Sequence, residues 1–133
     1  MPSRKIKAFL FYWGPVLLYS TLIFWLSSRE VPPDLPRGAD KILHFFEYFV
    51  FTFLLWRAFE QRGWRVRSKT LAVVLIAAIY AASDEVHQSL VPGRFASIYD
   101  WFADVAGILG MITLVLSKVK WRGAAVTYHY ETT

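Results

Sequence analysis

The chain has 133 residues, of which 56% are hydrophobic and 18% aromatic, and it carries a formal net charge of +5. It contains no cysteine, which excludes disulfides, thiol catalysis and cysteine-ligated metal sites. The apolar share exceeds that of ordinary soluble domains and falls in long blocks, which indicates membrane-spanning helices.

Four segments are long and apolar enough to cross a bilayer, and they lie at about 8–26, 42–59, 70–90 and 98–117. The Gly14-Pro15 step predicts a kink in the first of them. Short connections predict antiparallel neighbours. We therefore expect an all-α integral membrane protein, a compact bundle of four transmembrane helices. It would form a single domain over residues 1–133, with a polar C-terminal tail at 118–133.

Most of the 15 Lys and Arg residues lie in three regions of the chain. They are Arg4, Lys5 and Lys7; Arg57, Arg62, Arg65, Arg67 and Lys69; and Lys118, Lys120 and Arg122. Because basic residues favour the cytoplasmic side, both termini are expected inside and the loops at 27–41 and 91–97 outside. The positive charge then reflects topology in a plasma membrane, and no nucleic-acid partner is expected.

Antiparallel threading brings the remaining polar residues to the outer end. The second segment begins with Asp40, Lys41 and His44, and Asp40 is also placed to cap it. Asp40, His44 and Tyr48 recur every four residues and so share one helix face. Glycines at 107 and 110 would allow close contact between helices below these side chains.

The third and fourth segments add two further polar stripes. Asp84 shares a helix face with His87 and Gln88, whereas Glu85 points about 100° away. Arg94 follows the Pro-Gly step of the connecting loop, and Asp100 and Asp104 lie one turn apart on the next helix. Charged groups inside a membrane are costly and usually mark partners or functional sites.

These residues carry a resemblance to a known family. DKILHFFEY at 40–48, SDEVHQSLVPGR at 83–94 and SIYDWFADVAGILG at 97–110 resemble the VanZ-like family over roughly residues 10–117. The resemblance implies a small, mostly bacterial protein with about four spans, whose best-known relative is associated with resistance to teicoplanin. The motif positions are Asp40, Lys41, His44, Tyr48, Asp84, Glu85, His87, Gln88, Pro92, Gly93, Arg94, Ser97, Asp100, Asp104 and Gly107.

Our first interpretation is an outer-facing polar pocket that binds, and in one version modifies, an anionic envelope lipid or cell-wall precursor. Lys41 and Arg94 would hold a phosphate or carboxylate. The catalytic candidates are His44, Asp84 and His87. The ligand-binding candidates are Asp40, Lys41, Tyr48, Glu85, Gln88, Arg94, Ser97, Asp100 and Asp104.

Other interpretations stay open. Intramembrane acids and histidines would also fit a small proton-coupled transporter, and a buried ion-pair network would fit a non-catalytic scaffold. A divalent cation could be held by Asp84, Glu85, Asp100 and Asp104 with His44 and His87, but no metal motif is present and no metal site is assigned. The sequence leaves enzyme activity, the ligand and the oligomeric state open.

Overall fold

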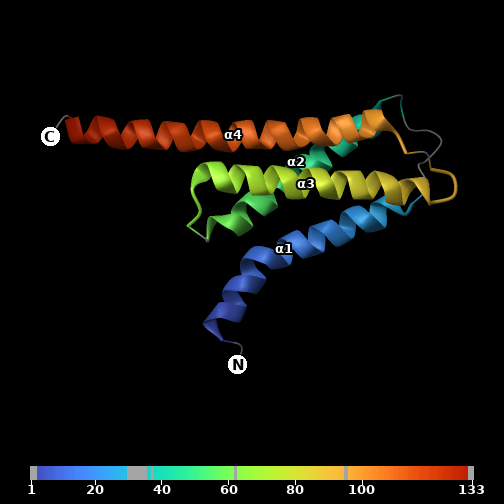
Figure 1. Ribbon diagram of the computed structural model, residues 1–133, viewed down its shortest axis with the longest axis horizontal. Coiled ribbons are helices and arrows are strands. Elements are labelled where there is room, and N and C mark those ends of the chain that lie inside the picture. Colours follow the sequence, from blue (N-terminus) through green and yellow to red (C-terminus); the bar gives the residue numbers. More distant parts are fainter. Residues whose placement is uncertain (1–2, 30–35, 37, 62, 95, 132–133) are drawn as a thin grey trace.

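The computed structural model describes residues 3–29, 36, 38–61, 63–94 and 96–131; Arg62 and most of the predicted outer loop at 30–37 lie outside this part. Within it the chain forms four α-helices, α1 (Arg4–Ser27), α2 (Ala39–Glu60), α3 (Val66–Ser89) and α4 (Ile98–Glu131) (Figure 1). All regular structure in the described residues is helical. The predicted all-α class is therefore confirmed.

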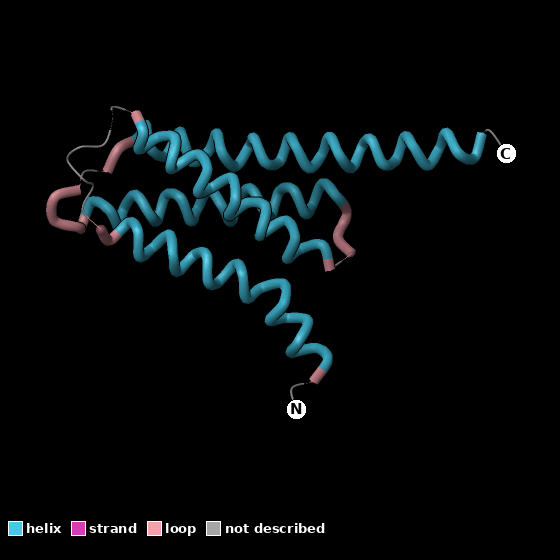
Figure 2. The backbone as a smooth tube through the Cα atoms, turned by 180° about the vertical axis from the view of Figure 1, so that it is seen from behind, coloured by secondary structure: helices cyan, strands magenta, loops and turns pink. Residues whose placement is uncertain are grey.

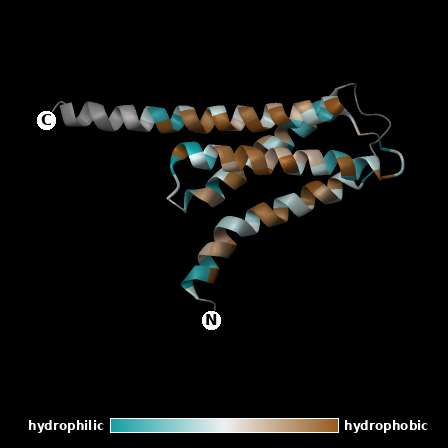
Figure 3. Cartoon of the chain, viewed as in Figure 1, coloured by the Kyte–Doolittle hydropathy of each residue, from teal (hydrophilic) through white to brown (hydrophobic). Residues whose placement is uncertain are grey.

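Each helix contains a stretch that is long and apolar enough to cross a membrane. The helices are longer than the predicted segments, because the hydrocarbon core limits the apolar stretch and not the helix itself. At the start of α1, for example, the Ser3 hydroxyl caps the helix by accepting from the Ile6 amide at 3.4 Å. Helix α4 continues far beyond its predicted end at 117. Figure 3 shows apolar residues along the helices and hydrophilic ones towards their ends.

The start of α2 differs from one expectation. Gly38 is the N-cap residue, with a φ of 84° that favours glycine, and no side chain caps the helix. Asp40 lies in the first turn instead and pairs with Lys41 at 2.9 Å. The predicted capping role of Asp40 is therefore wrong, because a neighbouring ammonium group competes for its carboxylate.

Helix α2 is the centre of the packing. It contacts each of the other three helices, most extensively α4, and Figure 2 shows it crossing the bundle diagonally. The core contains Ile23, Tyr48, Leu55, Val73 and Ile108, one or two from each helix. The N-terminal half of α1, which contains Pro15, bends away from the other helices (Figure 1). Trp13 in this half still contacts Phe59 of α2, with the ring centres 5.3 Å apart.

Large apolar side chains cover much of the outer surface. Leu18, Ile79 and Leu90 are 75%, 67% and 76% exposed. An exposed apolar surface of this kind is unfavourable in water but matches the hydrocarbon of a bilayer. The lipid bilayer is accordingly the environment that the fold requires.

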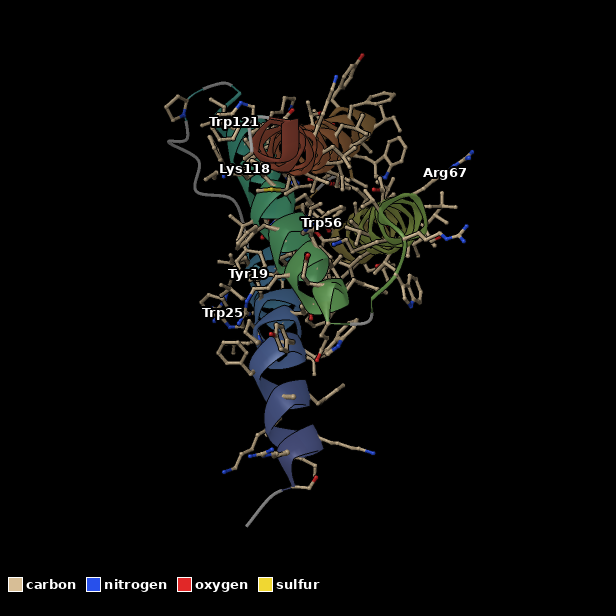
Figure 4. The ribbon with its side chains drawn as sticks, turned by 90° about the vertical axis from the view of Figure 1, so that its left-hand side faces the viewer. Tyr19, Trp25, Trp56, Arg67, Lys118 and Trp121 are labelled. Carbon is tan, nitrogen blue, oxygen red and sulfur yellow. The ribbon has the colours of Figure 1, made fainter. Side chains whose placement is uncertain are left out.

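The opposite end of the bundle holds a smaller polar contact. Lys69 lies 2.8 Å from a carboxylate oxygen of Glu60 and 3.9 Å from the centre of the Trp56 ring. Figure 4 shows Arg67 projecting outward near this end. Lys69 is buried although it is charged, because the carboxylate and the aromatic face replace its hydration.

A close contact between helix backbones fixes α2 against α4. A Cβ atom added to Gly107 would collide with the carbonyl oxygen of Phe45 and lie 3.1 Å from the Phe49 amide nitrogen. Gly110, one turn along, faces the Phe45 and Phe49 rings at ordinary van der Waals distance. Gly107 is thus the position where the two helices cannot accept a side chain.

We therefore expect Gly107→Ala to lower the free energy of unfolding by about 1–3 kcal/mol, because the methyl group must push α2 and α4 apart. Thermal unfolding of the purified protein in detergent measures this. Gly14→Ala is the matched control, since a Cβ there has nothing within 4 Å. Equal stability of the two variants would contradict the close helix contact.

Candidate functional site

The sequence-predicted polar residues come together at one end of the bundle, in two clusters. The first, which we call the Asp84 cluster, joins the end of α1 to the end of α3 and consists of Ser27, Ser28, Asp84, His87, Gln88 and Arg94. The second, which we call the His44 cluster, joins α2, α3 and α4 and consists of Asp40, Lys41, His44, Glu85, Ser97, Asp100 and Asp104.

In the Asp84 cluster, one buried carboxylate oxygen accepts two hydrogen bonds. Asp84 Oδ2 receives the Ser27 hydroxyl at 2.8 Å and the Gln88 amide nitrogen at 2.9 Å. Asp84 and Gln88 lie on one face of α3, as predicted, and Ser27 reaches them from α1. These bonds hold the end of α1 against the end of α3.

His87 is the outer member of this cluster. Its Nε2 lies 2.9 Å from the Ser28 hydroxyl, and its ring stacks on Phe24 with the ring centres 4.2 Å apart. Ser27 and Ser28 were not among the predicted site residues. The signal that could have found them is two adjacent hydroxyls at the end of an otherwise apolar segment.

Arg94 is placed by a tight turn. The Arg94 amide donates to the Val91 carbonyl at 3.1 Å, and Gly93 has a φ of 79°. Proline at the second position and glycine at the third position are typical of a type II turn, which explains the Val-Pro-Gly-Arg sequence.

The Arg94 guanidinium turns back onto the protein. It donates to the Leu26 carbonyl at 3.2 Å, the Arg29 carbonyl at 3.1 Å and the Gln88 side-chain oxygen at 3.0 Å. The Leu26 carbonyl also accepts from the Arg29 amide at 3.0 Å, so Arg94 is its second donor. In this arrangement Arg94 ties the end of α1 to the end of α3.

The His44 cluster is centred on a buried pair between α2 and α4. His44 Nδ1 lies 2.9 Å from Asp104 Oδ1, and the two residues are 5% and 0% exposed. The second carboxylate oxygen, Asp104 Oδ2, is buried without a hydrogen-bond partner among the described residues. The hydroxyl of Tyr48, one turn along α2, is also buried and unpaired.

Glu85 joins this pair from α3 rather than joining Asp84, which agrees with its predicted direction on the helix. Glu85 Oε2 accepts from the Ser97 amide at 2.9 Å, and Oε1 is buried without a partner in the described part of the chain. One donor atom each from His44, Glu85 and Asp104 lie within 4.8 Å of one another. These three side chains could hold a metal ion.

Lys41 lies at the outer edge of the same cluster. Its ammonium nitrogen is 2.9 Å from both Asp40 Oδ2 and Asp100 Oδ1, and its side chain remains 43% exposed. An ammonium group has three N–H donors, so these two ion pairs leave one donor for another partner.

An open pocket of about 370 Å³ lies between the ends of α3 and α4. Its lining consists of Ala82, Glu85, Ala96, Ser97, Ile98 and Trp101. The walls are mostly apolar, and the Trp101 indole N–H is buried without a hydrogen-bond partner among the described residues. The pocket therefore combines a hydrocarbon-like surface with the carboxylate of Glu85.

A family model described as VanZ/LLP1 matches residues 1–119. No curated protein and no solved structure matches the chain.

The bonds of Arg94 give a stability prediction. We expect Arg94→Lys to lower the free energy of unfolding by about 1–2 kcal/mol, because a single ammonium cannot reproduce the planar fork that reaches two carbonyls and an amide. Chemical or thermal unfolding in detergent measures the loss. Arg67→Lys is the control, because Arg67 is exposed at the other end. An Arg94→Lys protein as stable as the wild type would favour the ligand-holding role predicted from the sequence.

Proposed function

The chain belongs to the VanZ/LLP1 family, and we propose that it is an integral membrane protein that binds the polar headgroup of an amphiphilic envelope molecule. The observation that carries this proposal is the pocket between α3 and α4, whose apolar walls lead to Glu85. A molecule with an acyl or isoprenoid chain could enter such a pocket from the bilayer. Its polar end would then meet the His44 cluster.

Two groups are suited to contact the headgroup. Lys41 offers an N–H to a phosphate or carboxylate, and Glu85 Oε1 offers an acceptor to a hydroxyl or amine. Both are anchored to the first turn of α4. Glu85 is bonded to Ser97 and Lys41 to Asp100, three residues further on. One headgroup carrying both kinds of group could therefore engage both.

These contacts favour an anionic envelope lipid or a lipid-linked cell-wall precursor, in which phosphate and hydroxyl groups occur together. The sequence resemblance extends the proposal to glycopeptide susceptibility, because teicoplanin acts on wall precursors outside the membrane. Should the protein also modify its ligand, His44 is the best-placed of the three catalytic candidates. The carboxylate of Asp104 contacts the His44 ring and would orient it, as a third group orients the general base of a catalytic triad. Asp84 and His87, in contrast, already bond to Ser27 and Ser28.

A structural role is the second candidate, and it is favoured by one observation. Among the described residues, Asp84, Gln88 and Arg94 have no buried side-chain atom without a hydrogen-bond partner, in contrast to Glu85 and Asp104. We propose that this cluster serves as a scaffold that holds α1, α3 and the 91–97 turn, while the His44 cluster faces the ligand.

Lipid binding tests the proposed function directly. We expect Lys41→Ala and Ala82→Phe to weaken binding of phosphatidylglycerol or an isoprenoid phosphate by about tenfold or more, as the loss of one charge-assisted hydrogen bond predicts. The first removes the free donor, and the second fills the pocket with a ring. Native mass spectrometry of the purified protein with each added lipid measures the bound fraction.

Two matched variants control for surface charge and bulk. Lys118→Ala removes an exposed ammonium at the other end of the bundle, and Ser83→Phe adds a ring beside the pocket lining. Both should bind lipid like the wild type. Equal lipid binding by all four variants would exclude the pocket and Lys41 as the headgroup site.

We also propose that the polar end faces outward and both termini face the cytoplasm, on the basis of the basic residues at 57–69. Because the chain lacks cysteine, Pro92→Cys and Arg67→Cys each introduce a unique thiol at an exposed position. A membrane-impermeant maleimide should label Pro92→Cys in intact cells and Arg67→Cys only after permeabilisation. The reverse labelling pattern would invert the topology.

A further inference from the structure

Three side chains from three helices meet inside the bundle with the composition of a metal-ligand set. They are His44 from α2, Glu85 from α3 and Asp104 from α4, and all three are buried. We propose that they form a binding site for one divalent transition-metal ion, such as Zn²⁺ or Mn²⁺. Metal binding can be measured without a lipid, so this site does not depend on the proposed function.

The spacing of the donor atoms fits such an ion. One atom from each side chain lies within 4.8 Å of the others. Nitrogen and carboxylate ligands lie at about 2.0–2.2 Å from Zn²⁺, so two ligands of a tetrahedral ion are about 3.3–3.6 Å apart. Small side-chain rotations close the remaining difference. An imidazole with two carboxylates suits Zn²⁺ or Mn²⁺ better than Mg²⁺, which prefers oxygen ligands and water.

The unpaired oxygen atoms are a second observation that points to a cation. Asp104 Oδ2 and Glu85 Oε1 are both buried and lack a hydrogen-bond partner among the described residues. A buried carboxylate oxygen without a partner is costly, and a cation between the two acids would satisfy both at once. One carboxylate oxygen of Glu85 lies within 4.8 Å of one carboxylate oxygen of Asp104.

The charges around the cluster are also unbalanced. In the described part of the chain, no Lys or Arg forms an ion pair with Glu85 or Asp104. Lys41 is bonded to Asp40 and Asp100, and Arg94 is bonded to carbonyls and an amide. Only His44 opposes two carboxylates, and even a protonated ring would leave one negative charge. A divalent ion beside a neutral imidazole balances the two carboxylates of Glu85 and Asp104.

The surroundings hold the ligands in place as an outer shell would. The Ser97 amide fixes one oxygen of Glu85 and leaves the other free. The backbone contact at Gly107, one turn after Asp104, holds α4 against α2 at His44. Outer-shell contacts of this kind orient metal ligands and tune their affinity.

The site adjoins the pocket because Glu85 belongs to both. Three protein ligands leave a coordination position of a four-coordinate ion open. Resting on the proposed function, we infer that a phosphate oxygen of the headgroup occupies this position. The ion would then allow an acidic cluster to accept an anionic ligand.

The test uses the full-length wild-type protein, purified in detergent without a polyhistidine tag and stripped with a chelator. Zn²⁺, Mn²⁺ and Mg²⁺ are titrated separately against a competing chromophoric chelator, and metal content is measured after desalting. We expect one Zn²⁺ or Mn²⁺ per chain and no stoichiometric Mg²⁺. Binding that is non-saturable, or that is absent for both Zn²⁺ and Mn²⁺, overturns the site.

Isosteric variants identify the ligands. Glu85→Gln and Asp104→Asn should weaken metal binding by at least about 10–100-fold, which is the range for the loss of an outer-shell contact alone. Glu60→Gln and His87→Ala remove comparable groups outside the site and should keep wild-type affinity. If the controls lose the metal and the site variants retain it, the ligands lie elsewhere and the assignment is wrong.

A spectroscopic measurement on the wild type identifies the ligands even if the site variants do not fold. X-ray absorption of the Zn²⁺-loaded wild type should show a nitrogen and oxygen shell that includes one imidazole, and this imidazole signal should persist in His87→Ala. A shell without imidazole overturns the proposal. Lipid binding is also compared between the chelator-stripped and the Zn²⁺-loaded protein. Weaker binding after stripping supports the contact between the phosphate and the ion, whereas equal binding overturns that contact and leaves the metal site and the proposed function to their own tests.

Discussion

The interior of a bilayer offers no hydrogen-bond partners, and this constraint governs the polar end of the molecule. Acids, histidines, an amide and two cations gather there from all four helices and must satisfy one another. Their bonds run between helices more than within them: Ser27 to Asp84, Lys41 to Asp100 and His44 to Asp104. The polar contacts then determine how the apolar helix faces pack, because leucine and phenylalanine side chains gain little hydrophobic free energy on moving from lipid to protein.

The two clusters meet this constraint to different degrees. In the Asp84 cluster, the side chains of Gln88 and Arg94 donate hydrogen bonds to oxygen atoms of the protein. These bonds hold α1 against α3. In the His44 cluster, oxygens of Glu85 and Asp104 are buried and have no hydrogen-bond partner in the described part of the chain, and the same holds for the nearby Tyr48 hydroxyl. A network whose polar groups all have hydrogen-bond partners serves packing. A network with buried polar groups that lack partners is where a ligand gains the most binding free energy. The division of roles follows from that contrast.

Much of this could be predicted from the sequence. Hydropathy predicted the four spans, and helical periodicity predicted that Glu85 diverges from Asp84 and that Gly107 lies where helices approach. Periodicity could not predict which of the polar helix faces contact one another, because these contacts depend on how α2 crosses the bundle. It also could not foresee that Arg94 would turn towards the end of α1, since the carbonyls of Leu26 and Arg29 become acceptors only once that helix stops there. Ser27 and Ser28 were missed because short hydroxyls at a helix end are common without any site.

The unpaired groups also link binding to stability. A buried polar atom without a partner costs about 1–3 kcal/mol, and several lie close together around His44. Because α2 and α4 are in close contact at Gly107, separating them to let water in would cost free energy. The folded bundle therefore carries this cost until an occupant supplies a donor or a positive charge. A molecule or ion that does so and binds only the folded state would stabilise it by an amount that grows with the logarithm of its concentration divided by its Kd.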